Sequence, residues 1–352
     1  MQPMQSHEKA RPSTIHYEYD FTPDIGSSIE ILPGLRWLRL PLPFLLGHIN
    51  VWLLKDKKGW VIVDTGIGSS DTRDVWSKVF LNDLDNEPAT RVVVTHLHPD
   101  HVGCAGWLCE RFGVQLSMSQ NEYLLCRVLV ADTEKPVPEE GRQFYRAAGF
   151  SEEQLVLYER IFGSFGKMVT PLPQSYRRLQ HGSAITIGNH RWQVIVGRGH
   201  SPEHVCLFCS ELNVLISGDQ ILPTISSNVS VFPTEPDANP LDDWLKTLKR
   251  LQAELPEDVL VLPAHGKPFR GAGLRLNALI KEHQDGLDAL RAICIEPKRA
   301  VDVFPALFKG KITDKNYIMA TGEALAHIHY LQNRGELRVD RMEDGVRWYK
   351  TI

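Results

Sequence analysis

The 352-residue sequence contains no long uninterrupted hydrophobic segment. Its most apolar stretch, residues 40–54, is broken by proline, glycine, histidine and asparagine, and it falls far short of the ~20 apolar residues that a transmembrane helix needs. The first 13 residues are polar, with no apolar segment after a basic start, so a secretory signal peptide is not expected. These absences predict a cytoplasmic protein with no membrane partner.

The sequence also lacks a charge excess of either sign. Its 39 Lys and Arg residues nearly balance 43 Asp and Glu residues, which gives a net charge of −4. No strong basic field therefore indicates a nucleic acid or an acidic membrane as partner. A composition of 43% hydrophobic and 23% charged residues excludes a disordered or fibrous chain, and the length allows about two domains.

Cysteine is scarce. The six cysteines, without a secretory signal, are expected to be reduced and buried thiols. Cys206 and Cys209 have CxxC spacing, but they lie in an apolar segment that predicts a buried strand, where positions three apart face opposite sides. A metal or redox role for this pair is therefore not expected.

Short β-rich segments alternate with helical patterns through most of the chain, which predicts a layered α/β fold. Several of these segments lead directly into Asp, His or Gly-His, so polar chemistry is expected at strand ends. The predicted strands are residues 59–63, 91–95, 114–117, 191–196, 205–209, 214–217 and 258–262.

Residues 119–173 depart from this alternation and predict a helical insertion. Ser151 and Gln154 have the spacing of a capping box, and an apolar stripe follows, formed by Leu155, Tyr158, Phe162 and Phe165. The insertion is either a cap over a functional site or a plain pair of packing helices. Two further helices are expected over residues 240–255 and 273–295.

The C-terminal residues have the pattern of a small separate unit. A short helix and a longer one are followed by two strands around Asp344-Gly345, an order that suggests a winged helix. The predicted organisation is a domain of residues 1–295, which includes the insertion, and a winged-helix-like domain of residues 296–352.

The clearest chemical motif is Thr95-His96-Leu97-His98-Pro99-Asp100-His101, directly after a β-branched run. In an extended segment His96 and His98 point the same way and can reach one metal ion. Pro99 then turns the chain and can direct Asp100 and His101 at a second ion. Three further candidate ligands follow predicted strands: His200, Asp219 and His265.

The order HxHxDH, GH, GD and HG resembles the metallo-β-lactamase superfamily, and Val63-Asp64-Thr65-Gly66 resembles its first motif. The resemblance spans about residues 32–269 and implies an αβ/βα sandwich with the metal site along one edge. The C-terminal unit extends it to members with an appended winged helix. By this resemblance, one metal is bound by His96, His98 and His200, and the second by Asp100, His101 and His265, with Asp219 bridging and Asp64 supporting a ligand.

A metal pair of this kind lowers the pKa of water from about 15.7 toward roughly 7 and polarises the bond to be attacked. Five imidazoles and two carboxylates suit two divalent ions such as Zn²⁺, with Fe or Mn as alternatives. Asp100 is the candidate catalytic residue, as a proton donor to the leaving group.

The bridging aspartate differs from the Cys or Ser of true β-lactamases, and His98 differs from the glutamate of flavodiiron proteins. Antibiotic hydrolysis and a diiron oxygen reductase are therefore not expected.

Other polar residues near the motifs are more ambiguous. His204, four residues after His200, is either a supporting partner of a ligand or a packed histidine at a strand start. His48 is more simply a loop histidine than a contact at the mouth of the site. Ser226 and Asn228, which follow Asp219, are either substrate contacts or parts of an ordinary turn.

Two reactions fit these ligands. The first is hydrolysis of a small thioester or ester, by similarity to hydroxyacylglutathione hydrolases and acyl thioesterases, although no basic glutathione-binding segment is evident. The second is a metal-dependent ribonuclease or phosphodiesterase, since superfamily members with a winged helix include RNA-cleaving enzymes.

The second reaction is weakly supported, because residues 296–352 hold ten Lys and Arg against eight Asp and Glu. The winged unit is as well suited to packing or to forming a homodimer. A scaffold without catalysis is disfavoured, since no ligand position is replaced.

Overall fold

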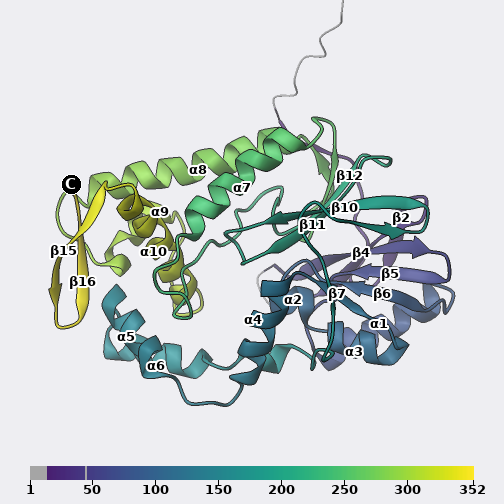
Figure 1. Ribbon diagram of the computed structural model, residues 1–352, viewed down its shortest axis with the longest axis horizontal. Helices are drawn as coiled ribbons and strands as arrows, with labels where there is room; N and C mark the ends of the chain where they lie inside the picture. The colour runs from purple at the N-terminus through teal and green to yellow at the C-terminus, as the bar shows by residue number, and fades with distance from the viewer. Residues whose placement is uncertain (1–13, 44–45) are drawn as a thin grey trace, which may run out of the picture.

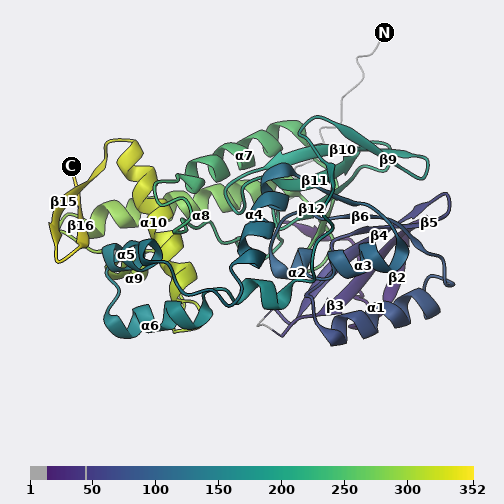
Figure 2. The ribbon, with the colours of Figure 1, turned by 60° about the horizontal axis from the view of Figure 1, so that its bottom comes forward.

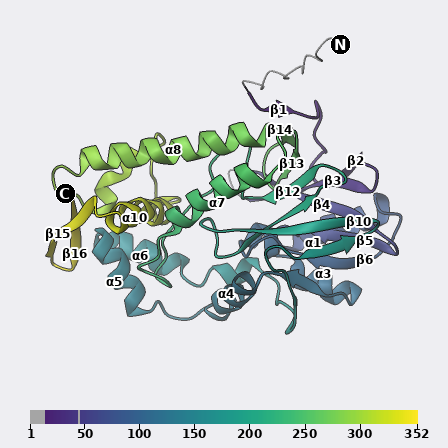
Figure 3. The ribbon, with the colours of Figure 1, turned by 45° about the horizontal axis from the view of Figure 1, so that its top comes forward.

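The computed structural model describes residues 14–43 and 46–352. Two seven-stranded β-sheets lie face to face within these residues, and helices cover both outer faces (Figure 1, Figure 3). This is the expected αβ/βα sandwich. The prediction that the chain has no signal peptide concerns residues 1–13, which lie outside the described part of the chain.

The first sheet has the order β2-β3-β4-β5-β6-β7-β8. Its first four strands form an antiparallel meander, and β5 pairs in parallel with β6. The strands are β2 (Ser28–Leu32), β3 (Leu35–Pro41), β4 (His48–Asp56), β5 (Gly59–Val63), β6 (Ala89–Val93), β7 (Leu116–Met118) and β8 (Arg177–Arg178).

The second sheet has the order β1-β14-β13-β12-β11-β10-β9, and its β12 and β13 are parallel. Every segment predicted as a strand overlaps a strand of one of the two sheets. The strands are β1 (His16–Tyr17), β9 (Ala184–Ile187), β10 (His190–Gly197), β11 (His204–Cys209), β12 (Val214–Gly218), β13 (Leu260–Pro263) and β14 (Phe269–Arg270).

Apolar packing holds the layers together. The faces of the two sheets enclose a buried cluster that includes Trp37, Trp52 and Trp192. Helices α1 (Ser70–Asn82) and α3 (Ala105–Phe112) cover the first sheet. Helices α7 (Pro240–Glu254) and α8 (Ala272–Ile293) cover the second, and both match the predicted helices to within two residues (Figure 3).

The insertion is helical, as predicted. It comprises α4 (Gln120–Ala131), α5 (Glu139–Ala148), α6 (Glu152–Ile161) and the 3₁₀ turn η1 (Phe165–Met168). Helix α4 lies beside the sandwich, and α5 and α6 lie next to the C-terminal elements (Figure 2). The Ser151–Gln154 capping box is present at the start of α6.

The apolar stripe expected on α6 is shorter than predicted. Leu155 and Tyr158 are buried in a small cluster within the insertion, and Phe162 packs against it. Phe165, however, packs against the cluster of the first sheet instead. Gly163, with φ of 69°, follows the end of α6 and redirects the chain, so the prediction that Phe165 continues the stripe was wrong.

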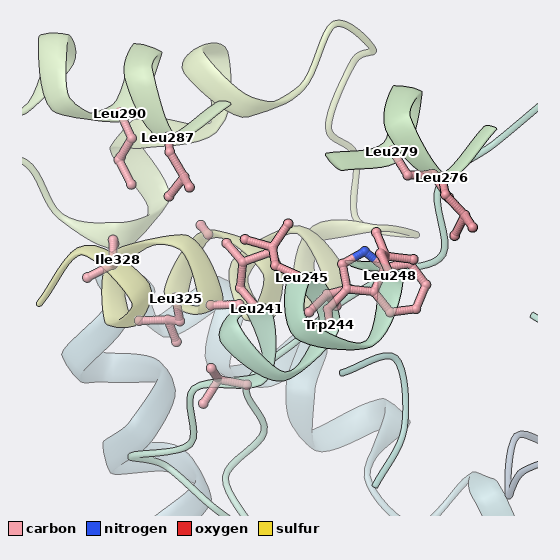
Figure 4. Close-up of a cluster of buried hydrophobic side chains, with 14 of the residues drawn as sticks. Leu241, Trp244, Leu245, Leu248, Leu276, Leu279, Leu287, Leu290, Leu325 and Ile328 are labelled. Atoms are coloured by element: carbon pink, nitrogen blue, oxygen red, sulfur yellow. The ribbon is translucent and has the colours of Figure 1, made fainter. Parts of the chain in front are cut away.

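The C-terminal elements are η2 (Ala300–Val303), α9 (Phe304–Leu307), α10 (Tyr317–Asn333) and the hairpin of β15 (Leu337–Glu343) and β16 (Val346–Thr351). The order of short helix, long helix and hairpin is as expected, and Asp344 and Gly345 form the hairpin turn with positive φ. Helix α10 shares one buried cluster with α7 and α8, to which Leu325 and Ile328 contribute together with leucines of both helices (Figure 4). The winged-helix assignment and the boundary at residue 296 stay predictions.

Two further expectations concern cysteines and membranes. All six cysteines are unpaired and buried, as predicted, and Cys206 and Cys209 belong to clusters on opposite faces of their sheet. Within residues 14–43 and 46–352, no helix has the length and apolarity that crossing a bilayer requires.

Candidate metal centre

The polar residues singled out in the sequence converge on one edge of the sandwich. Asp64 follows β5, His96 follows β6, Asp219 follows β12 and His265 follows β13. Because β5 and β6 are parallel, and β12 and β13 are parallel, the carboxyl ends of each pair open at the same edge. Val205 donates a backbone hydrogen bond to the Thr95 carbonyl and so joins the two sheets there.

The first group of candidate ligands consists of His96, His98, His200 and Asp219, whose ligand atoms all lie within 4.8 Å of one another. His96 Nε2 is 2.8 Å from His98 Nδ1 and 3.2 Å from His200 Nε2. Three imidazole nitrogens and a carboxylate oxygen at this spacing could hold a metal ion.

The second group consists of Asp100, His101 and His265. Asp100 and His101 lie on the short helix α2 (Pro99–Val102), which begins at Pro99, so the proline turns the chain as predicted. Asp100 Oδ2 is 3.6 Å from His101 Nε2 and 3.4 Å from His265 Nε2.

Asp219 lies between the two groups. Its Oδ2 is 3.4 Å from His200 Nε2, while its Oδ1 is 3.5 Å from His101 Nε2 and 3.6 Å from His265 Nε2. Among the described residues, neither Asp219 Oδ1 nor His101 Nε2 has a hydrogen-bond partner, although both atoms are buried. Buried polar atoms are rarely unpaired, so these two atoms fit a site that binds a cation.

Asp64 orients one of these ligands. Its Oδ2 is 2.8 Å from His101 Nδ1, and its Oδ1 accepts a hydrogen bond from the Thr95 backbone N–H at 2.8 Å. The Asp64 backbone has φ of 65°, a left-handed conformation that is uncommon outside glycine. The aspartate is therefore held in an unfavourable conformation at the point where its carboxylate fixes the ring of His101.

Backbone carbonyls orient two other candidate ligands. The Asn228 carbonyl is 2.7 Å from His200 Nδ1, and the His48 carbonyl is 3.0 Å from His265 Nδ1. Each carbonyl accepts the Nδ1 proton and leaves Nε2 as the donor to a metal. His48 and Asn228 thus contact the site through their main chains, and Ser226 has no hydrogen bond to any candidate ligand in the described residues.

His204 supports Asp219. The Asp219 backbone N–H donates to His204 Nε2 at 3.0 Å, which makes His204 a neutral acceptor. Gly218 precedes Asp219 with φ of 50°, and a Cβ atom there would lie 2.6 Å from the His204 ring. A side chain at this position would collide with His204, so a steric constraint explains the glycine before Asp219.

The electrostatics of the site favour a neutral His98 and positive charge around His101. Burial, followed by the neighbouring His200, lowers the pKa of His98 to about 3, so its ring keeps a free lone pair. Burial opposes a charge on His101 as well, but the carboxylates of Asp100, Asp64 and Asp219 outweigh it and raise the pKa of His101. Three carboxylates around one imidazole produce a negative potential that stabilises a bound cation.

Glu122 is a residue of the site that the sequence reasoning missed. It lies near the start of α4 and is fully buried; one oxygen accepts from the Leu97 N–H and the other from the Ser201 hydroxyl and the Glu203 N–H. It therefore ties the His96–His98 segment to the segment after His200. The sequence of α4 has the pattern of an ordinary helix and gives no sign of these contacts. Only the three-dimensional structure shows that Glu122 joins the two segments.

Replacement of Glu122 by alanine is expected to destabilise the protein by about 3 kcal/mol, because three buried donors lose their acceptor. Urea unfolding of the metal-free protein measures this loss. Glu110→Ala, which removes an exposed carboxylate from α3, serves as the matched control and should have little effect. Equal stability of both variants would show that the Glu122 contacts contribute little.

Comparison with known families agrees with this architecture. Residues 45–265 match the model of the metallo-beta-lactamase superfamily, and residues 287–352 match the model of the metallo-beta-lactamase-like C-terminal domain. The chain therefore belongs to the metallo-beta-lactamase superfamily, which indicates a hydrolase with a metal-binding cluster of His and Asp residues.

Two solved structures are similar over nearly the whole chain. A beta-lactamase domain protein from Burkholderia ambifaria is 40% identical, with a TM-score of 0.88 over 96% of this chain and 98% of that one. A metallo-beta-lactamase family protein from Thermus thermophilus is 27% identical, with a TM-score of 0.77 over 92% of this chain and 100% of that one.

More distant relatives cover the chain in part. The acyl-coenzyme A thioesterase MBLAC2 of Homo sapiens is 25% identical over 67% of this chain and 79% of its own length. An uncharacterized protein of Aquifex aeolicus is 26% identical over 49% of this chain, and the match spans 66% of that protein.

Proposed function

We propose that this protein is a dinuclear metal-dependent hydrolase that acts on a small thioester or ester. The observation that carries the proposal is the position of Asp219, whose two carboxylate oxygens face the two groups of candidate ligands separately. His96, His98 and His200 would hold one cation, Asp100, His101 and His265 the other, and Asp219 both. Zn²⁺ suits five imidazoles and two carboxylates, with Fe or Mn as alternatives.

The bound cations would supply a lowered pKa for attacking water and polarisation of the substrate carbonyl. The residues of the chain orient the candidate ligands and exclude water. Asp64 and the carbonyls of His48 and Asn228 fix the rings of three ligands and keep their Nδ1 atoms protonated. The buried setting of His96 and His101 excludes bulk water from the base of the site.

Asp100 is the proposed proton donor to the leaving group. Its side chain is 17% exposed, compared with 11% for Asp219, and it is the less buried of the two ligand carboxylates. A carboxylate at the open side of the site can exchange protons with solvent and with a departing thiol or alcohol.

The substrate proposal rests on two supports. A relative that matches two thirds of this chain is named as an acyl-coenzyme A thioesterase. In addition, the insertion leaves apolar side chains exposed on α4, Leu124 and Val128, which suit contact with an acyl chain better than with a polyanion. The net charge of −4 is likewise unfavourable for binding RNA.

Thiol release from a panel of acyl-coenzyme A thioesters by zinc-loaded protein tests this function, with His98→Ala as the blank. We expect turnover that depends on chain length and is lost in the variant. No turnover across the panel, together with cleavage of single-stranded RNA at low salt, would replace the thioesterase proposal with the ribonuclease alternative.

Removal of the metal gives a separate prediction. Dialysis against a strong chelator is expected to abolish hydrolysis, and added Zn²⁺ should restore it, because the proposed mechanism needs the cations to activate water. Activity and metal content are followed together through the titration. Undiminished hydrolysis by protein shown to contain no metal would contradict the mechanism.

A further inference from the structure

A buried connection joins the C-terminal elements to the candidate metal centre. Helix α10 packs against the segment of residues 219–232, which follows the bridging aspartate and is called here the 219–232 loop. Gly322 of α10 accepts a backbone hydrogen bond from Val231 at 3.0 Å. A Cβ atom on Gly322 would lie 2.7 Å from the side chain of Ser230, so the helix and the loop are in direct contact.

The connection continues through one side chain. The Asn228 amide donates to Glu323 Oε2 of α10 at 2.9 Å, while the Asn228 carbonyl is 2.7 Å from His200 Nδ1. The Ser230 hydroxyl lies at hydrogen-bond distance from Asn228 Oδ1 and from the Met319 carbonyl of α10. Glu323 therefore holds the residue whose main chain orients a candidate ligand.

The contact between Glu323 and Asn228 does not require an ionised carboxylate. Desolvation raises its pKa to about 7; the Asn228 hydrogen bond opposes this shift and the carboxylate of Glu282 on α8 adds to it. Such a carboxyl is costly to ionise inside the fold near neutral pH. A neutral side chain with an oxygen at the same place would accept from Asn228 equally well, so the hydrogen bond and not the charge is what positions Asn228.

We infer that Glu323 is a positioning residue for the metal centre, which acts through Asn228 to hold the ring of His200. This inference rests on the proposed metal-binding function. By this inference, the C-terminal elements help to orient a candidate metal ligand through α10. Glu323 itself touches neither a candidate ligand nor the reacting atoms in the described structure.

Cobalt substitution tests the inference without relying on hydrolysis. Co²⁺ is titrated into the metal-free full-length protein, its d–d absorption spectrum is recorded, and its affinity is measured by competition with a chelator. Glu323→Ala is expected to alter the spectrum and to weaken the affinity on the order of tenfold, the lower end of the range for residues that support metal ligands. Glu323→Gln, which still accepts from Asn228, should restore both readings.

Thr321→Val is the matched control on the same helix. Thr321 is buried, and its hydroxyl bonds the Tyr317 carbonyl of α10, so its loss affects the helix but not the 219–232 loop. We expect wild-type cobalt binding from this variant. If Glu323→Ala fails to fold, Asn228→Leu provides the same comparison, with a weakened cobalt affinity expected.

The outcomes separate the inference from the function on which it rests. A wild-type protein that binds Co²⁺ and a Glu323→Ala variant with the same spectrum and affinity would overturn the inference and leave the hydrolase proposal intact. A wild-type protein that binds no Co²⁺ would overturn both. A change of equal size in Thr321→Val would show that α10 affects metal binding only through general stability.

Discussion

Asp219→Ala is expected to lower turnover about a thousandfold and to reduce the metal content from two ions per chain to at most one. The carboxylate faces both sets of candidate ligands, at 3.4 Å from His200 Nε2 and 3.5 Å from His101 Nε2. Its loss leaves each set one donor short. Several kcal/mol of transition-state stabilisation by the metal pair correspond to this loss in rate.

Asp285→Ala is the matched control for this variant. Asp285 is an exposed aspartate of α8 whose carboxylate pairs with Lys281, far in sequence from every candidate ligand. Metal content by elemental analysis and turnover should both match the wild type in the control. Full activity of metal-depleted Asp219→Ala would rule out the dinuclear mechanism.

Asp64→Asn is expected to weaken metal binding by the Asp100, His101 and His265 group by about 10- to 100-fold, the usual effect of losing a partner that supports a ligand. The aspartate faces His101 Nδ1 at 2.8 Å, and a neutral amide in its place no longer holds that proton with a charged acceptor. Asparagine tolerates a φ of 65° better than most residues, so the fold is expected to persist.

Competition with a chelator measures the affinity, and thermal unfolding of the metal-free proteins shows whether the fold is retained. Asp64→Ala is the informative comparison, because alanine both lacks the acceptor and is strained at this backbone conformation. We expect it to bind metal no better than Asp64→Asn and to unfold at a lower temperature. Wild-type affinity in Asp64→Asn would contradict the assigned role.

The candidate ligands at the ends of strands could be predicted, because each follows a segment whose residues mark it as a strand. Asp64, His96, Asp219 and His265 each follow a strand that the sequence marks by its β-branched or apolar residues. Parallel pairing then brings these strand ends to one edge without further information. The seven candidate ligands expected from the motifs do lie together at this edge.

Contacts between distant segments were not predictable in the same way. Glu122 lies on a helix with no unusual pattern, and its partners Leu97 and Ser201 lie on separate segments of the chain. Asn228 was considered only as a substrate contact or a turn residue, since its main-chain carbonyl carries no signal in the sequence. Such contacts depend on the tertiary packing of α4 and α10.

Two smaller differences have local causes. The sequence pattern does not predict β3 and β4, because the prolines and polar residues between 40 and 50 interrupt the alternation where these two strands meet. The sequence predicts that the stripe on α6 reaches Phe165, because helical spacing continues beyond the point where Gly163 redirects the chain. In both cases the error in the prediction lies where the chain turns between two elements.

The most direct test of the account is a crystal structure of the zinc-loaded protein with anomalous data collected at the zinc edge. The account predicts two anomalous peaks per chain, roughly 3.5–4 Å apart. One should lie among His96, His98 and His200, and the other among Asp100, His101 and His265, with Asp219 between them. Two zinc-free groups, or a single peak that Asp219 does not contact, would contradict the dinuclear centre.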